Sequence, residues 1–304
     1  MSTACLFDTT LCIGCRACQV ACKAWNEMPP EQTRFNGAGG DCENPEALSS
    51  KTYTRITFHE IPDYTGAQAR AVFVKRQCMH CLDPACVSAC PVAALKTIEG
   101  DRNNAGAIVY DAEKCMGCRY CMLACPFSVP KFEWDKRVPK IRKCTFCIDR
   151  LEKEQVEAAV NGITLEGDAR DRFNKSQRIP ACVKVCPTGA IIVGEREELI
   201  AEGHRRIEAQ KGKPDLRQYL DHIYGEKEVG GTSWLYLANV PFDHLGFRTD
   251  LGVRPYPAYT NVALGGVPPA VLGVGAVLGG VYWMLQRRTE VKEVDTERAT
   301  THDT

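Results

Sequence analysis

The longest apolar stretch of this 304-residue chain lies near its C-terminus, where no charged residue occurs between Arg254 and Arg287. Pro268 and Pro269 suit the first turn of a helix, because the N–H groups that they lack would be unpaired there. A helix from these prolines to the end of the apolar run spans about 28 Å at ~1.5 Å per residue. This length predicts a transmembrane helix within residues 262–286.

The residues around this segment fit the two interfaces of a membrane. Basic residues after the span outnumber those before it, so the positive-inside bias puts the C-terminus in the cytoplasm and the rest of the chain outside. The alternative, a buried helix of a soluble protein, does not explain the flanking arginines. The basic residues are Arg287, Arg288, Lys292 and Arg298 after the span, against Arg248 and Arg254 before it. The aromatic residues at its ends are Tyr256, Tyr259, Tyr282 and Trp283.

The rest of the chain shows short periodic segments. Residues 52–58 alternate in β-favouring types and predict a strand, and residues 71–75 predict a second. Residues 91–98 and 107–111 flank a polar, glycine-bearing turn and predict a β-hairpin. Residues 195–210 have the pattern of an amphipathic helix.

Residues 211–254 carry few apolar clusters. We therefore expect them to form an extended tail that lies over the domain or over a neighbouring subunit.

The chain contains eighteen cysteines, and sixteen of them fall into four groups of four. The third group is followed by Pro126 and has the spacing of the bacterial ferredoxin run, in which three cysteines ligate one 4Fe–4S cluster and the fourth reaches a second cluster. The second group adds two residues to this run, the first replaces the proline with Lys23, and the fourth is split by a long insertion. The groups are Cys12, Cys15, Cys18 and Cys22; Cys78, Cys81, Cys86 and Cys90; Cys115, Cys118, Cys121 and Cys125; and Cys144, Cys147, Cys182 and Cys186.

This spacing favours iron–sulfur clusters over structural zinc and over disulfides. Zinc usually takes its ligands from two separated cysteine pairs, whereas three cysteines here fall within seven residues, from Cys115 to Cys121. Disulfides of secreted proteins do not recur with fixed short gaps. Four groups of four predict four 4Fe–4S clusters, whose iron–thiolate bonds would supply much of the stability. Cys5 and Cys42 are left over and are predicted to be free thiols.

Three features near the motifs leave alternatives open. His80 lies between two cysteines, where it would tune or ligate a cluster, or be a hydrogen-bonded or exposed side chain without such a role. The basic run from Arg137 to Lys143 directly precedes Cys144 and would offset the charge of a cluster or form a solvated face. The insertion, residues 148–181, would be a solvated surface or a docking surface for another subunit.

Composition excludes some classes of function. The chain has 38 basic and 38 acidic residues, so its net charge of zero gives no electrostatic footprint for nucleic acid. No acid–base pair or activated nucleophile stands out, which indicates a non-catalytic protein. No basic residue precedes Arg16 and no apolar run precedes the first motif, so neither a secretory nor a twin-arginine signal is expected. Export would then require a partner that carries the signal.

Four ferredoxin-type groups, a split fourth group and one C-terminal membrane helix resemble the iron–sulfur β subunit of membrane-bound respiratory formate dehydrogenases. The resemblance covers most of the chain. Residues 224–232 are as similar to the iron–sulfur subunit of membrane-bound nickel–iron hydrogenases. The chain departs from these families in two ways. Its insertion is longer than expected for formate dehydrogenases, and it lacks the export signal that is usual in the hydrogenase relatives. The most specific stretches are residues 12–26, 44–51, 77–81 and 180–187.

The resemblance implies which cysteines share a cluster. Members of the family pair the first motif with the fourth and the second with the third, and the predicted hairpin independently supports the second pairing. The four implied ligand sets are Cys12, Cys15, Cys18 and Cys186; Cys22, Cys144, Cys147 and Cys182; Cys78, Cys81, Cys86 and Cys125; and Cys90, Cys115, Cys118 and Cys121.

The resemblance also implies partners. Electrons would enter from a molybdopterin catalytic subunit near the first–fourth module and leave through the second–third module to a membrane cytochrome b and quinone. The alternative is the same electron-transfer role beside a nickel–iron catalytic subunit, or in another molybdopterin oxidoreductase such as a sulfur-compound reductase. A subunit that only docks and scaffolds is a different class of function that stays open.

The predicted fold class is α+β, with two ferredoxin-like two-cluster modules and one C-terminal transmembrane helix. Membrane anchoring would leave the cluster domain in the periplasm. The predicted divisions are an outer module over residues 1–77 and 126–200, an inner module over 78–125, an extended tail over 201–261, the transmembrane helix over 262–286 and a charged C-terminal tail over 287–304.

Overall fold

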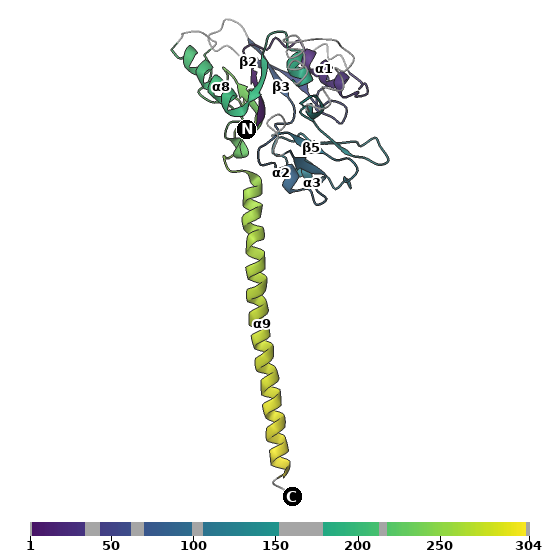
Figure 1. Cartoon of the computed structure of the whole chain (residues 1–304), viewed down its shortest axis with the longest axis vertical. Coiled ribbons are helices and arrows are strands. Elements are labelled where there is room, and N and C mark those ends of the chain that lie inside the picture. The colour runs from purple at the N-terminus through teal and green to yellow at the C-terminus, as the bar shows by residue number, and fades with distance from the viewer. Residues whose placement is uncertain are drawn as a thin grey trace, which may run out of the picture. The chain divides into compact units, whose positions relative to one another are not determined.

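The computed structural model describes residues 2–33, 43–61, 70–98, 106–151, 179–212 and 218–301 (Figure 1). The chain divides into one compact unit, residues 1–256, and a second unit, residues 257–304. The strands are β1 (Thr3–Asp8), β2 (Arg55–Ile61), β3 (Arg70–Arg76), β4 (Leu95–Thr97), β5 (Ile108–Tyr110), β6 (Lys131–Phe132), β7 (Ile141–Arg142), β8 (Ile191–Glu195) and β9 (Trp234–Leu237). The helices are α1 (Ala17–Trp25), α2 (Ala85–Ser88), α3 (Tyr120–Ala124), α4 (Ile148–Leu151), α7 (Ala181–Lys184), α8 (Arg196–Gln210), the 3₁₀ turn η1 (Glu228–Gly230) and α9 (Tyr256–Thr301).

A three-stranded sheet of order β8-β1-β9 brings both ends of the first unit together. Strand β1 pairs with β8 in antiparallel and with β9 in parallel orientation. Because successive side chains of a strand point to opposite faces, the sheet has two different surfaces. On one face Ala4 and Leu6 pack with Leu199 of α8. On the other face Cys5 and Phe7 join the larger core that contains cysteines of the predicted cluster sites.

Strand β9 shows the same division. Leu235 and Leu237 pack on the α8 side, whereas Trp234 and Tyr236 pack on the side of the cysteines. All four side chains are buried. The prediction of an extended tail over residues 211–254 is therefore wrong for this segment, because a four-residue run that is buried on both faces shows no alternation of polar and apolar positions.

Three antiparallel hairpins complete the first unit, β2–β3, β4–β5 and β6–β7. Hairpin β4–β5 confirms the hairpin predicted between the second and third motifs. Strand β3 agrees with the predicted strand, but β2 begins at Arg55, three residues after the predicted start, and continues to Ile61. Helix α8 also lies where the sequence predicts a helix. The hairpin turn near residue 100, Cys42 and most of the insertion lie outside the described residues.

The second unit is the long helix α9, which Figure 1 shows as one continuous coil. Among the described residues it alone has the length and composition to cross a membrane, over Tyr256–Lys292. Pro268 and Pro269 lie inside it rather than in its first turn, so that part of the prediction is wrong. Each proline removes one backbone hydrogen bond, a loss that membrane helices tolerate.

Candidate iron–sulfur cluster sites

The four Cys-x-x-Cys turns share one backbone feature. The residue before the second cysteine has a positive φ in each of them: 67° at Gly14, 49° at His80, 75° at Gly117 and 61° at Phe146. A left-handed residue reverses the local course of the chain, which lets the two flanking cysteines face a common centre. Glycine adopts this conformation without strain, whereas a residue with a Cβ pays about 1–2 kcal/mol.

In each motif a short helix carries the third cysteine; in the fourth motif this helix comes after the insertion. Arg16 and Arg119 are also left-handed and directly precede α1 and α3, which carry Cys18 and Cys121. In the other two motifs a proline precedes the helix, Pro84 before α2 with Cys86 and Pro180 before α7 with Cys182. Proline suits this place because its φ is fixed near helical values and an N–H is not needed there.

The four short helices pack in pairs. Helix α1 contacts α7, and α2 contacts α3. The first motif therefore lies beside the second half of the fourth motif, and the second motif beside the third. These are the two pairings that the predicted ligand sets require.

Burial and neighbouring thiols raise the pKa of most of the sixteen cysteines, and the neighbours reveal how the sulfurs are grouped. Burial raises the pKa of Cys22, and the thiols of Cys144, Cys182 and Cys147 raise it further. Cys22 belongs to the first motif in the sequence, yet its thiol neighbours are three cysteines of the split fourth motif.

Three further cysteines also have thiol neighbours from their own predicted sets. Burial raises the pKa of Cys81, with further effects from Cys78, Cys125 and Cys86. Burial raises the pKa of Cys121 to about 11, with effects from Cys118, Cys115 and Cys90. The pKa of Cys12 rises to about 11 for the same reason, with Cys186 and Cys15 as its thiol neighbours.

Two thiols also interact with the adjacent set. The strongest thiol neighbour of Cys18 is Cys182, and Cys86 interacts with Cys121 as well as with its own set. Sites within each helix pair are therefore close together. In the described part of the chain, no three His, Cys, Asp or Glu side chains converge on a single metal ion. A cluster spreads its four thiolates over four irons, so it requires a wider arrangement than one ion does.

The surroundings of the sulfurs fit a negatively charged cluster. The backbone N–H of Ala94 donates to Cys90 Sγ at 3.2 Å, and that of Phe146 donates to Cys144 Sγ at 3.4 Å. Trp234 buries its indole N–H with no hydrogen-bond partner among the described residues. Such donors stabilise the sulfur atoms of clusters. When bound, the clusters would supply one-electron transfer, and the sixteen cysteines would hold them.

His80 is completely buried and hydrogen-bonded, so the alternative of an exposed histidine is wrong. The backbone N–H of Ile108 donates to His80 Nδ1 at 3.0 Å, which leaves the ring proton on Nε2. Burial lowers the pKa of His80, and the charges of Lys143 and Lys75 lower it further. His80 is therefore a neutral side chain between two cysteines.

The basic run before Cys144 divides into exposed and buried members. Arg142 is partly exposed and its Nε donates to Glu133 Oε1 at 2.9 Å. Lys143 is 5% exposed and its Nζ donates to the backbone oxygens of Ile108 and Cys144. A solvated face does not describe Lys143, which lies inside the cluster region.

Cys5 belongs to β1 and is fully buried without a disulfide. Burial raises its pKa, and the charges of Cys182 and of other thiols contribute in the same direction. That Cys5 is a free thiol outside the ligand sets stays a prediction.

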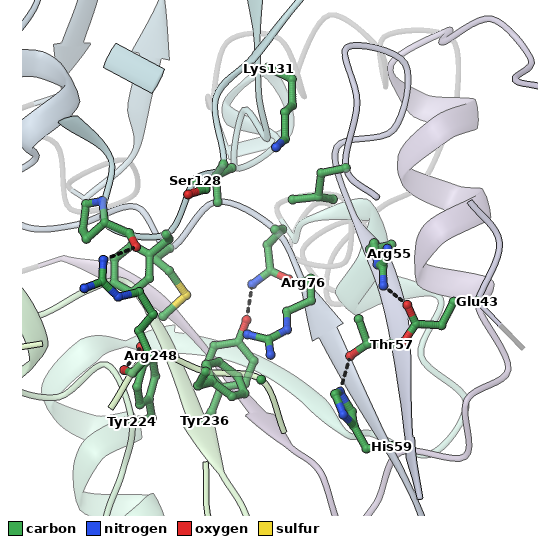
Figure 2. A pocket seen from close by; sticks show the side chains of 18 residues that line it. Glu43, Arg55, Thr57, His59, Arg76, Ser128, Lys131, Tyr224, Tyr236 and Arg248 are labelled. Carbon is green, nitrogen blue, oxygen red and sulfur yellow. Dashed lines mark hydrogen bonds and ion pairs between the residues drawn. The ribbon is translucent and has the colours of Figure 1, made fainter. Parts of the chain in front are cut away.

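A cavity of about 440 Å³ lies beside the cluster region, between strands β2 and β3 and the segment after β9 (Figure 2). In its wall Gln77 Nε2 donates to the hydroxyl of Tyr236 at 2.6 Å, and this hydroxyl donates to the backbone oxygen of Lys75 at 3.0 Å. Sequence reasoning missed this network because Tyr236 lies in the segment expected to be a tail.

Comparison with known proteins agrees with the motifs. The model of the 4Fe-4S dicluster domain matches residues 69–167. A protein of Nitratidesulfovibrio vulgaris is 37% identical over 94% of this chain and 67% of its own length. The hydrogenase-2 operon protein HybA of Escherichia coli is 35% identical over 79% of this chain and 71% of its own length.

A further relative covers nearly the whole chain. The iron–sulfur subunit of the nitrate-inducible formate dehydrogenase of Escherichia coli is 32% identical over 98% of this chain and 89% of its own length. The chain therefore belongs to the family of ferredoxin-type iron–sulfur subunits that includes those of formate dehydrogenases and HybA.

Proposed function

We propose that this chain is a non-catalytic electron-transfer subunit that holds four 4Fe–4S clusters in two ferredoxin-like modules. The observation that carries the proposal is the grouping of the thiols. Cys22 has Cys144, Cys147 and Cys182 as its neighbours, although it belongs to the first motif in the sequence. This reciprocal exchange of the fourth cysteine is typical of a two-cluster ferredoxin module.

The outer module combines the first and fourth motifs and holds two clusters. The inner module combines the second and third motifs and holds the other two. Contacts of α1 with α7 and of α2 with α3 support this division. The ligand sets are those given above: Cys12, Cys15, Cys18 and Cys186; Cys22, Cys144, Cys147 and Cys182; Cys78, Cys81, Cys86 and Cys125; and Cys90, Cys115, Cys118 and Cys121.

Exposed apolar side chains at both modules support partners on two sides. The outer surface consists of residues next to the first and fourth motifs, and the inner surface of residues next to the third motif. Exposed apolar patches of this kind mark protein interfaces. The outer surface is Leu11, Ile13, Val20, Trp25 and Val185. The inner surface is Met116, Tyr120, Leu123, Trp134 and Val138.

In this account a molybdopterin catalytic subunit covers the outer surface, and a membrane cytochrome b that reduces quinone lies beyond the inner module. Helix α9 anchors the chain with the cluster domain in the periplasm. A chain truncated before Val262 should stay soluble when it is expressed without partners, whereas the full chain should sediment with membranes. A truncated chain that still sediments with membranes would show that α9 is not the anchor.

A hydrogenase is the second candidate for the parent complex. The similarity to HybA supports it, since the identity is comparable to that of the formate dehydrogenase subunit. The electron-transfer role of this chain is the same in both complexes. The large subunit that co-purifies with the tagged chain distinguishes them by its molybdopterin or its nickel.

Replacement of Cys118 separates electron transfer from scaffolding. In the purified complex, Cys118→Ala should abolish electron flow to quinone while the catalytic subunit still reduces an artificial dye. The control is Cys5→Ala, which removes a buried thiol that is not a proposed ligand and should leave both activities intact. Quinone reduction at the wild-type rate in the fully assembled Cys118→Ala complex would contradict the proposal.

A further inference from the structure

Lys75 is a buried cation in the middle of the cluster region. It is 1% exposed on strand β3, and its ammonium group lies 4.1 Å from the centre of the Trp234 ring. Gln77 Oε1 accepts one hydrogen bond from it at 3.0 Å. No ion pair joins it to a carboxylate among the described residues. An ammonium without a counter-charge is costly to bury.

The thiols around Lys75 come from two neighbouring ligand sets. Its charge interacts most strongly with Cys182, Cys18 and Cys144. Cys18 belongs to the set of the first three cysteines, whereas Cys182 and Cys144 belong to the set completed by Cys22. Trp234, on which the ammonium lies, packs in the same core as Cys18 and Cys182. Lys75 therefore stands between the two sites of the outer module.

Lys143 is a second buried lysine near the site of Cys144. It is buried and donates hydrogen bonds to two backbone oxygens, with no carboxylate partner among the described residues. Its charge acts on Cys144 of the outer module and on Cys78 and Cys86 of the inner one. It therefore stands where the two modules meet.

Cys144 is a proposed cluster ligand on which the charges of both lysines act. We propose that Lys75 and Lys143 are the counter-cations of the cluster bound by Cys22, Cys144, Cys147 and Cys182, and that they raise its reduction potential above that of the same cluster without them. The inference rests on the proposed ligand sets. It concerns a fixed charge at each lysine, not a proton that moves.

The physical reason is the change of charge on reduction. A 4Fe–4S cluster with four thiolates is negative, and one electron makes it more negative by one unit. A cation in a medium of low dielectric constant therefore stabilises the reduced form more than the oxidised form. Because this cluster is the last of the outer module before the inner one, the two lysines hold the electron at the crossing between the modules.

The test is an anaerobic redox titration of the full chain in its complex, followed by electron paramagnetic resonance. Each neutral variant, Lys75→Met and Lys143→Met, should lower the equilibrium constant for reduction of this cluster about tenfold. This corresponds to a reduction potential lower by about 59 mV for one electron. The signal of this cluster is identified as the one lost in Cys147→Ala. Lys75→Arg keeps the charge and should keep a potential close to that of the wild type.

A matched control is Lys136→Met, which removes an exposed lysine that pairs with Glu133 and should shift no potential. Unchanged potentials in both methionine variants at full iron content would overturn the inference, as would an equal shift of all four clusters. If Lys75→Met binds less iron, the other two variants decide. A changed reduction potential in Lys75→Arg, or an unchanged one in Lys143→Met, would refute the role of charge. Too little iron in the wild type would instead refute the proposed function.

Discussion

His80 and Phe146 pack against each other with ring centroids 4.9 Å apart, and each occupies the same position of its own Cys-x-x-Cys turn. In the other two turns this position is a glycine. The ring of Phe146 also contacts Trp234, with centroids 6.3 Å apart. His80 and Phe146 thus both have a strained, left-handed backbone, and this conformation places their buried rings between the second and the fourth motif.

At Phe146 we expect the glycine variant to be more stable than the alanine variant. Both Phe146→Ala and Phe146→Gly should destabilise the folded chain by about 3–5 kcal/mol, because they leave a cavity beside His80 and Trp234. The glycine variant should nevertheless be the more stable of the two by about 1 kcal/mol, because φ is +61° at this position. Thermal or denaturant unfolding of the cluster-loaded protein measures the difference. An alanine variant more stable than the glycine variant would contradict the left-handed turn.

Two glycines of the first and third motifs differ in their surroundings. A Cβ at Gly14 would lie 2.5 Å from the Phe73 ring, whereas a Cβ at Gly117 would lie 3.5 Å from the Phe132 ring. Both alanine variants carry the cost of a positive φ, but only Gly14→Ala adds a steric clash. Iron content and electron paramagnetic resonance should show that Gly14→Ala loses the cluster of Cys12, Cys15, Cys18 and Cys186. Gly117→Ala should keep all four clusters. Four clusters in both variants would contradict the clash and would mean that the ring of Phe73 moves aside.

Gly225 lies in the stretch that resembles hydrogenase subunits, and its φ is +96°. A Cβ there would lie 2.3 Å from the backbone oxygen of Trp234. Gly225→Ala should therefore displace β9 and lower the melting temperature strongly. Gly212→Ala is the control, since this glycine also has a positive φ but nothing lies near its missing Cβ. A similar, small effect of both substitutions would contradict the close packing at β9.

His222 pairs with Glu228 at 2.7 Å, and this hydrogen bond raises the pKa of His222 above its usual value of about 6.5. The pair therefore stabilises the folded chain fully below about pH 6.5, and the contribution is lost as the pH rises through the folded-state pKa. Because His222 is partly exposed, we expect less than about 1 kcal/mol. The melting temperature of His222→Gln should fall more at pH 6 than at pH 8.5, and the reverse order would contradict the pairing.

The sequence predicts the chemistry of this chain better than its core. Cysteine spacing indicates all four motifs, and proline or glycine beside them indicates two of the four turns directly. The positive φ of Phe146 has no local signal, because its residue type does not favour it, and a single histidine such as His80 is too weak a signal to predict it. Only the packing of the two rings, which joins segments far apart in the sequence, explains that backbone.

Sequence patterns did not predict strand β9 or the burial of Lys75. The run Trp234–Leu237 is short and apolar on both faces, so its pattern does not distinguish a strand from other buried segments. A lysine in a strand normally indicates a solvated position. Its burial depends on cysteines from three distant segments, and no local pattern describes them.

The central claim, four clusters held by sixteen cysteines, is tested most directly by the iron content of the protein purified under strict exclusion of oxygen. We expect about sixteen iron atoms and a matching amount of acid-labile sulfide per chain, four of each for every 4Fe–4S cluster. An iron content well below this value, or zinc in place of iron, would contradict it.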